Sequence, residues 1–135
     1  FHAPAEEKIE ARTYPLGAHL DHRNDAGELA IVALMFEEGA HNTALEPIFA
    51  AMPRKAGGRA TLGSANIADL LPVNHNAYAF MGSLTKPPCT EGVRWNVLTT
   101  AVQLSPAQLE AFRAIYPMNA RPVQPLNSRS VVVGH

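Results

Sequence analysis

His2 and His19 are the residues of this chain whose side chains could hold a metal together. Imidazole nitrogens suit zinc at neutral pH, and a catalytic zinc needs about three protein ligands plus an open position for water. Their separation fits neither one helix nor one loop, but it fits two neighbouring strands with the ligands on facing rungs. By themselves, two histidines this far apart are more often ordinary surface or core residues, so both interpretations stay open.

A further polar candidate is the hydroxyl of Thr85, which directly precedes Lys86-Pro87-Pro88. Proline fixes its own φ and restricts the residue before it, so we expect a rigid double-proline turn here, built from an extended, stiff segment. Such stiffness is useful where a polar group must be held still. The alternative is an ordinary loop between two strands, and the residues of this segment alone favour it.

The elements that must position these residues are predicted mainly as strands. In residues 14–22, alternation puts one set of side chains on each face: Leu16, Ala18, Leu20 and His22 on one, and Gly17, His19 and Asp21 on the other. Residues 28–36 form a mostly apolar run whose length suits a strand buried on both faces. We expect further strands over 78–81, 94–98 and 130–133, short helices over 43–52 and 66–71, and a basic surface loop over 53–63. The pattern predicts a mainly β fold with short helices.

One helix start is marked by local sequence alone. Ser105 is placed as an N-cap, Pro106 at the first helical position and Gln108 at the third. Pro117 is expected to end that helix.

Composition bounds the possibilities further. The 135 residues allow one domain at most, and a net charge of −1 gives no reason to expect nucleic acid or an anionic membrane as partner. No apolar run approaches the length of a membrane span. The start at Phe1, without an initiator methionine, leads us to expect a processed, cleaved or engineered chain. The single cysteine, Cys89, cannot form an internal disulfide.

Four blocks of the sequence resemble the α-class carbonic anhydrases of bacteria, in the family's order along the chain. They are Phe-His-Ala-Pro-Ala-Glu at 1–6, Tyr-Pro-Leu-Gly-Ala-His-Leu-Asp-His at 14–22, Gly-Ser-Leu-Thr-Lys-Pro-Pro-Cys-Thr-Glu-Gly-Val-Arg-Trp at 82–95 and Asn-Ala-Arg-Pro-Val-Gln-Pro-Leu-Asn at 119–127. The resemblance implies a large, mostly antiparallel twisted sheet with a zinc site in a central cleft. It also implies that residues 1–135 are a single partial domain, roughly the C-terminal half, with the N-terminal half absent.

The resemblance assigns roles to the candidates. It implies that His2 and His19 are zinc ligands, with the third ligand two residues before His2 and so ahead of Phe1. It implies a lyase that hydrates carbon dioxide reversibly to bicarbonate and a proton. The nucleophile would be zinc-bound hydroxide, oriented by Thr85, whose own hydroxyl donates a hydrogen bond to Glu6.

A small apolar pocket for carbon dioxide is also implied. Its residues are expected to be Ile31, Leu84, Val93 and Trp95, with Asp21 and Lys86 at positions where this chain departs from the family.

Two further departures bear on the metal. Gly17 stands where the family has a glutamate that holds a ligand histidine by its second nitrogen, and Glu7 replaces a common family histidine. Loss of such a supporting partner typically costs about 10–100-fold in metal affinity or activity. Together with Asp21 and Lys86, these changes favour weak or lost turnover. The alternative function is therefore a catalytically weak or inactive binding or structural module, with a strand-paired or swapped dimer as one form of it.

The resemblance and the half-length together set the expected surroundings. The cofactor is zinc, and the substrates are carbon dioxide and bicarbonate. Half a sheet leaves unpaired edges, so we expect the chain to pair with its missing N-terminal half or with a second copy as a homodimer. In bacterial members a cysteine at the position of Cys89 is bonded to one near the start of the full domain, and the family is commonly periplasmic or secreted.

Overall fold

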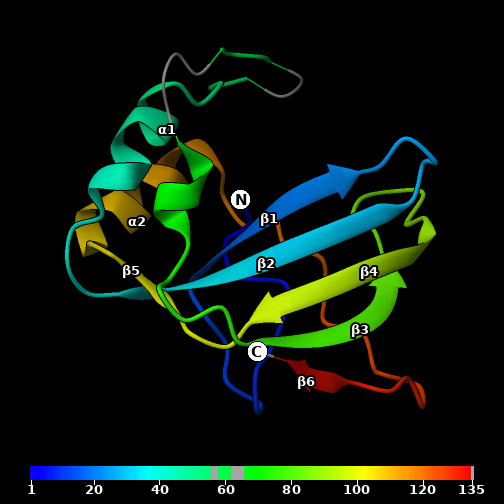
Figure 1. Cartoon of the computed structure of the whole chain (residues 1–135). Coiled ribbons are helices and arrows are strands. Elements are labelled where there is room, and N and C mark those ends of the chain that lie inside the picture. The colour runs from blue at the N-terminus through cyan, green and yellow to red at the C-terminus, as the bar shows by residue number, and fades with distance from the viewer. Residues whose placement is uncertain (56–57, 62–65, 135) are drawn as a thin grey trace.

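A twisted sheet runs through the molecule, and the helices gather at one end of it (Figure 1). The structure is a computed structural model that describes residues 1–55, 58–61 and 66–134. The sheet order is β1 (Leu16–Arg23), β2 (Leu29–Glu38), β4 (Glu91–Leu98), β3 (Ala77–Ser83) and β6 (Val132–Gly134), while β5 (Val102–Leu104) pairs with β2 beyond β4. The prediction of a mainly β fold with short helices is confirmed.

The strand directions follow from the connections between strands. β1 and β2 pair antiparallel through a tight turn, in which the Gly27 N–H donates to the Asn24 carbonyl at 3.0 Å and Gly27 adopts a φ of 83°. β3 pairs antiparallel with β4 and with β6. β2 pairs parallel with both β4 and β5, because the chain after β2 passes through helical segments and then runs back along β3 before β4 begins. The sheet is thus mixed, with more parallel pairing than we expected.

Most predicted elements are found with small shifts at their ends. The helix predicted over 43–52 is a 3₁₀ turn, η1 (Thr43–Leu45), that continues into α1 (Glu46–Ala50), and the turn predicted over 66–71 is η2 (Ile67–Leu70). β5 was not predicted, because three residues are too few for a clear alternation. Residues 56–57 and 62–65 of the predicted basic loop lie outside the described residues. Within the described ranges, no helix is long and apolar enough to cross a membrane.

The predicted helix start at Ser105 is confirmed. α2 (Pro106–Ile115) begins with a capping box, in which the Ser105 side chain accepts from the Gln108 N–H and the Gln108 side chain accepts from the Ser105 N–H. Its apolar side places Phe112 in the core against the rings of Phe1 and Phe49. Helix α2 thereby packs against Phe1, the residue directly before His2.

The turn expected at the double proline is confirmed, whereas the extended conformation expected for Lys86-Pro87-Pro88 is wrong. The chain turns there, and the Cys89 N–H donates to the Lys86 carbonyl at 2.9 Å. Pro87 and Pro88 are joined by a cis peptide bond, which the sequence pattern did not reveal. The turn lies between β3 and β4 and places Thr85 just beyond the end of β3.

Two apolar clusters lie on opposite faces of the sheet. One joins Leu16 and Ala18 of β1 to α2, and the other contains Ile31, Val93 and Trp95. Because side chains alternate along β1, His19 belongs to the second face, where its ring meets Trp95 edge-on at 4.8 Å.

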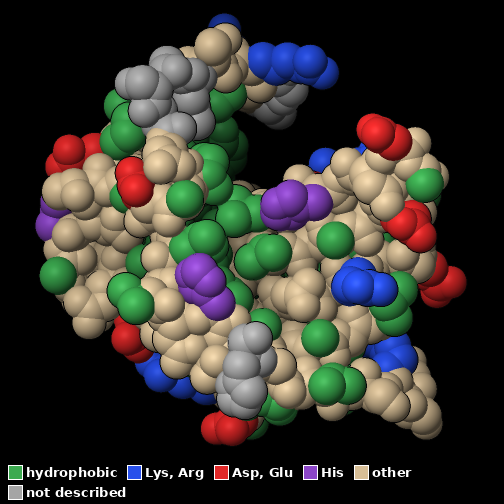
Figure 2. All heavy atoms as spheres, viewed as in Figure 1, with side chains coloured by type: hydrophobic (Ala, Val, Ile, Leu, Met, Phe, Trp, Pro, Cys, Tyr) green, Lys and Arg blue, Asp and Glu red, His purple; other side chains and the backbone are tan. Residues whose placement is uncertain are grey.

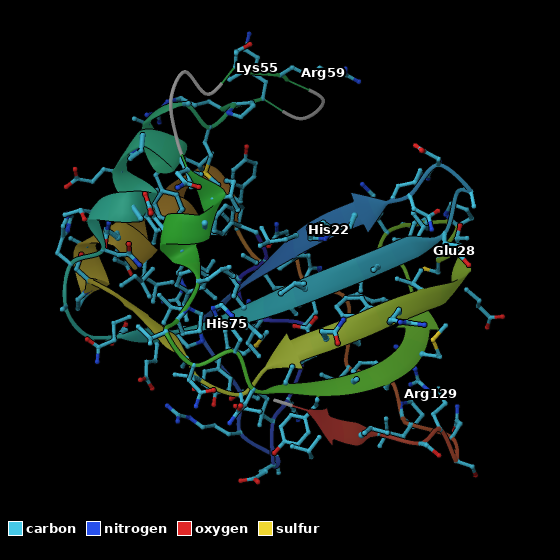
Figure 3. All side chains as sticks on the ribbon, in the orientation of Figure 1. His22, Glu28, Lys55, Arg59, His75 and Arg129 are labelled. Carbon is cyan, nitrogen blue, oxygen red and sulfur yellow. The ribbon has the colours of Figure 1, made fainter. Side chains whose placement is uncertain are left out.

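The first face is the one seen in Figure 2, where hydrophobic side chains are visible between two histidines. Figure 3 labels these as His22 and His75. The functional candidates therefore lie on the far side of that view.

Candidate functional site

His2 and His19 are brought together by backbone pairing between the N-terminal segment and β1. The His2 N–H donates to the Gly17 carbonyl at 2.9 Å, and the Gly17 N–H donates to the His2 carbonyl at 2.9 Å. This places the two imidazole rings 4.9 Å apart between centroids. The two neighbouring strands expected for these histidines are thus reduced to a single bridge beside β1.

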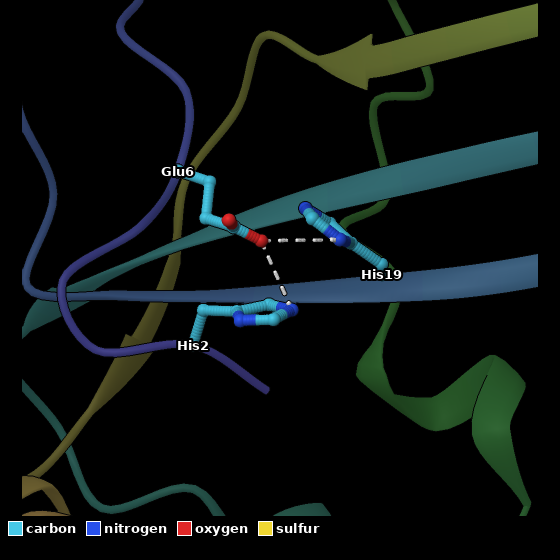
Figure 4. Close-up of side chains that lie close together, drawn as sticks. All are labelled: His2, Glu6 and His19. Atoms are coloured by element: carbon cyan, nitrogen blue, oxygen red, sulfur yellow. Dashed lines mark ion pairs between the residues drawn. The ribbon is translucent and has the colours of Figure 1, made fainter. Parts of the chain in front are cut away.

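Glu6 completes a cluster with the two histidines (Figure 4). Its Oε1 lies 3.1 Å from Nε2 of His2 and 3.9 Å from Nδ1 of His19. The Glu6 side chain is only 3 % exposed. The same oxygen accepts a hydrogen bond from the hydroxyl of Thr85 at 2.7 Å. The structure therefore brings His2, His19, Glu6 and Thr85 to one point.

The second oxygen of Glu6 is held by a residue that sequence reasoning did not assign to the site. The backbone N–H of Arg121 donates to Oε2 of Glu6 at 2.6 Å. Arg121 belongs to the closing block at 119–127, so the motif was visible, but a backbone contact leaves no signature in a side-chain pattern. Both oxygens of this buried carboxylate are thus satisfied, as a buried charge requires.

Each histidine is also held through the nitrogen that faces away from the cluster. Nδ1 of His2 lies 3.3 Å from the Asn119 carbonyl, and Nε2 of His19 lies 2.5 Å from Oε1 of Glu7. The Glu7 carboxylate is an acceptor, so Nε2 of His19 donates to it and Nδ1 of His19 keeps its lone pair toward the cluster. Both nitrogens of His2 face acceptors, the Asn119 carbonyl and Oε1 of Glu6. Metal-binding histidines are characteristically fixed in this way.

The two histidines fit a zinc ion. One ligand atom from each of His2, Glu6 and His19 falls within 4.8 Å of the others. The two imidazole nitrogens are suitable zinc ligands, whereas Oε1 of Glu6 already accepts from the Thr85 hydroxyl. Burial lowers the pKa of His2 from its ordinary value, although Glu6 acts in the opposite direction. A neutral imidazole is the form that binds a metal.

The expected pocket residues lie at different depths. Ile31, Val93 and Trp95 are buried on the face of His19, and Leu84 packs against them partly buried. Asp21 pairs with Ile31, which pairs with Trp95, so the three lie in one row across the sheet. The side chains of Asp21 and Lys86 are exposed. The row therefore has an apolar interior and a charged outer end.

A cleft of about 990 Å³ opens beside Glu6 and Thr85. Glu6, Thr85 and Trp95 form part of its wall, and the segment 121–131 forms another part. Glu7 also lines the cleft.

Comparison with known proteins gives a consistent result. Residues 2–135 match the family model of the eukaryotic-type carbonic anhydrases. The chain is 45 % identical to a carbonic anhydrase of Klebsiella pneumoniae over 134 residues, which are 98 % of this chain and 54 % of that protein. It is 40 % identical to a carbonic anhydrase of Nostoc sp. over 98 % of this chain and 51 % of that protein. The chain thus spans about half the length of these curated relatives.

Solved structures agree with the sequence matches. The α-carbonic anhydrase of Photobacterium profundum superposes with a TM-score of 0.90 at 47 % identity, covering 96 % of this chain and 60 % of that one. The enzyme of Thermovibrio ammonificans, in complex with the inhibitor sulfanilamide, has a TM-score of 0.90 at 41 % identity, covering 96 % and 58 %.

Proposed function

Because this chain belongs to the eukaryotic-type carbonic anhydrase family, we propose that it carries the site for reversible hydration of carbon dioxide to bicarbonate and a proton. The observation that carries the proposal is the convergence of Nε2 of His2, Nδ1 of His19 and the Thr85–Glu6 hydrogen bond on one point. Nε2 of His2 and Nδ1 of His19 would hold a zinc ion. When bound, zinc acts as a Lewis acid that makes water nucleophilic at neutral pH.

The chain's own residues then orient the reactants. Thr85 has a single hydroxyl proton, and it is donated to Glu6 at 2.7 Å. The Thr85 oxygen can therefore only accept a hydrogen bond from the cleft side, which orients a donor at the metal position. Glu6 keeps its acceptor role because the Arg121 N–H holds its other oxygen in a buried position.

The apolar face around Trp95 supplies the place for carbon dioxide. Trp95 lines the cleft and its indole N–H is already donated to the Ser83 carbonyl, so this part of the wall offers no free hydrogen bond to compete for the substrate. Ile31 and Val93 are buried in the same apolar cluster as Trp95. A small apolar molecule gains free energy by leaving water for such a surface. Its carbon would lie beside the position that Thr85 and Glu6 control.

The direct test is metal analysis and a carbon dioxide hydration assay on the purified protein, with and without a sulfonamide. We expect zinc bound in proportion to protein and hydration that the sulfonamide abolishes. Protein that carries no zinc after incubation with it, and that shows no sulfonamide-sensitive activity, would refute the proposal.

We also propose that the site is completed by further chain, either the N-terminal half of the domain or a second copy. In the described part of the chain, His2 and His19 are the histidines in the cluster, whereas a catalytic zinc takes about three protein ligands. The half-length coverage of the relatives supports this proposal. A periplasmic or secreted location is proposed from the same resemblance, and cell fractionation tests it.

The alternative function is a weak or inactive binding module, and the shortage of zinc ligands in the described chain favours it. If it holds, the protein stays folded when treated with a chelator and shows no hydration activity when zinc is restored. Circular dichroism and the same assay distinguish the two functions.

A further inference from the structure

We propose that Glu7 is the positioning residue for His19 and that it replaces the carboxylate that is lacking at Gly17. The proposal rests on the zinc site described above, but its central claim concerns the orientation and tautomer of one imidazole ring. It revises the expectation that Gly17 leaves His19 without support.

The contact between the two side chains is close and sheltered from water. Nε2 of His19 lies 2.5 Å from Oε1 of Glu7, and the two side chains are 8 % and 12 % exposed. An ionised carboxylate only accepts, so the proton of the imidazole sits on Nε2. Nδ1, on the other side of the ring, then keeps its lone pair toward the cluster, 3.9 Å from Glu6.

The space around Gly17 explains why the carboxylate comes from elsewhere. A Cβ at this position would lie 3.0 Å from Cβ and 3.2 Å from Cα of Ala5. The paired hydrogen bonds between His2 and Gly17, both 2.9 Å, hold the segment that carries Ala5 at this distance. A larger side chain at Gly17 would therefore push that segment away from β1.

The N-terminal segment that contains Ala5 also carries Glu7, the carboxylate that contacts His19. Glu7 follows Ala5 by two residues, so the chain that excludes a side chain at Gly17 also carries a carboxylate to His19. Oε2 of Glu7 is buried and has no hydrogen-bond partner among the described residues. The described hydrogen bonding of Glu7 is thus directed to His19. Gly17 and Glu7 act as a compensated pair.

A surface pair in the same chain offers a matched control. Nε2 of His41 lies 2.5 Å from Oε1 of Glu46, but these side chains are 49 % and 58 % exposed and lie outside the cluster. Glu46→Gln therefore removes a similar contact without touching the proposed site.

The test uses Glu7→Ala, Glu7→Gln and Glu46→Gln in the full chain. In the metal-free protein, nitrogen NMR of the imidazoles should find His19 protonated at Nε2 in the wild type and in Glu7→Gln, whose amide oxygen still accepts. Glu7→Ala should lose this preference. Zinc titration should give an affinity about 10–100-fold lower for Glu7→Ala, a smaller loss for Glu7→Gln and no change for Glu46→Gln.

The outcomes separate this proposal from the proposed function. A His19 tautomer that is unchanged in Glu7→Ala, or a zinc affinity equal to that of the wild type, overturns the role of Glu7. A wild type that fails to bind zinc counts against the proposed function, while the NMR comparison still decides the role of Glu7. If Glu7→Ala unfolds, as circular dichroism would reveal, Glu7→Gln carries the test. A shift of its His19 proton to Nδ1 would then contradict the proposal.

Discussion

The hydroxyl oxygen of Thr85 lies 2.7 Å from Oε1 of Glu6, although 79 residues separate the two positions in the sequence. The contact joins the turn after β3, in the middle of the chain, to the N-terminal segment beside β1. Its acceptor is a carboxylate that is almost fully buried and satisfied at both oxygens. The proposed chemistry and much of the local stability therefore depend on the same few atoms.

Variants of Thr85 should distinguish the orienting role of its hydroxyl from the packing of its side chain. Thr85→Val keeps the shape of the side chain but removes the hydroxyl, so we expect hydration activity to fall roughly 10²-fold because the orienting acceptor is lost. Thr85→Ser keeps the hydroxyl and should retain most of the activity. Stopped-flow assays with zinc content measured in parallel provide the test. Equal activity in the two variants would contradict the orienting role.

Glu6 should be important for stability as well as for activity. Glu6→Gln leaves one acceptor oxygen where two donors, Thr85 and the Arg121 N–H, now converge. We expect the free energy of unfolding to fall by about 1–3 kcal/mol, since a buried polar group loses its partner. Urea denaturation measures this, with Glu110→Gln on the exposed side of α2 as a control that should change little. An unchanged urea concentration at the midpoint of unfolding in Glu6→Gln would be inconsistent with the hydrogen bonds of Glu6.

Gly17→Ala should destabilise the fold by crowding rather than by backbone strain. The added Cβ would meet Ala5 at 3.0 Å, and overpacking of this kind typically costs about 1–3 kcal/mol. Gly134→Ala, whose Cβ would meet no atom within 4 Å, should be close to neutral. Thermal unfolding of the two variants compares them directly. Equal loss in both would show that close approach at Gly17 is not the cause.

Because of Tyr78, the free energy of unfolding should fall as the pH becomes alkaline. The Glu10 carboxylate, whose oxygen lies 3.3 Å from the phenol, raises the pKa of Tyr78 above its ordinary value of 10.0. The folded state therefore holds the proton more tightly than the unfolded state. This contribution is present below pH 10.0 and is lost as pH rises through the folded-state pKa.

Glu10→Gln tests the cause of that shift. It should lower the pKa of Tyr78, as followed by the ultraviolet absorbance of tyrosinate, and Tyr78→Phe identifies which transition belongs to this residue. A titration that Glu10→Gln leaves unmoved would argue against the ion–phenol contact.

The edges of the sheet should cause self-association of the isolated chain. β1 and β6 are the outer strands of the order, and Val132 and Val133 of β6 are 62 % and 59 % exposed. Unpaired edges with apolar side chains favour strand pairing, and a lysine on an edge opposes it. We expect light scattering to detect dimers or larger species at raised concentration, and Val133→Lys to reduce them. A compact monomer at every concentration would refute this prediction.

The parts of the fold that sequence could predict are those governed by neighbouring residues. The capping box of α2 depends on Ser105 and Gln108, three positions apart, and the two faces of β1 depend on alternation alone. The parallel pairing of β2 with β4 could not be predicted in this way, because strand direction depends on the path of the intervening chain.

By itself, the sequence determined the family, the mainly β class and the residue types offered for chemistry, because these are written in motifs and in local periodicity. Tertiary structure alone decided the contacts that hold those groups in place. The bond from Glu7 to His19, the hold of the Arg121 N–H on Glu6 and the approach of Ala5 to Gly17 each join separate segments. The physical reason is that such contacts depend on how the N-terminal and C-terminal segments pack beside β1, and neither residue type nor spacing specifies that packing.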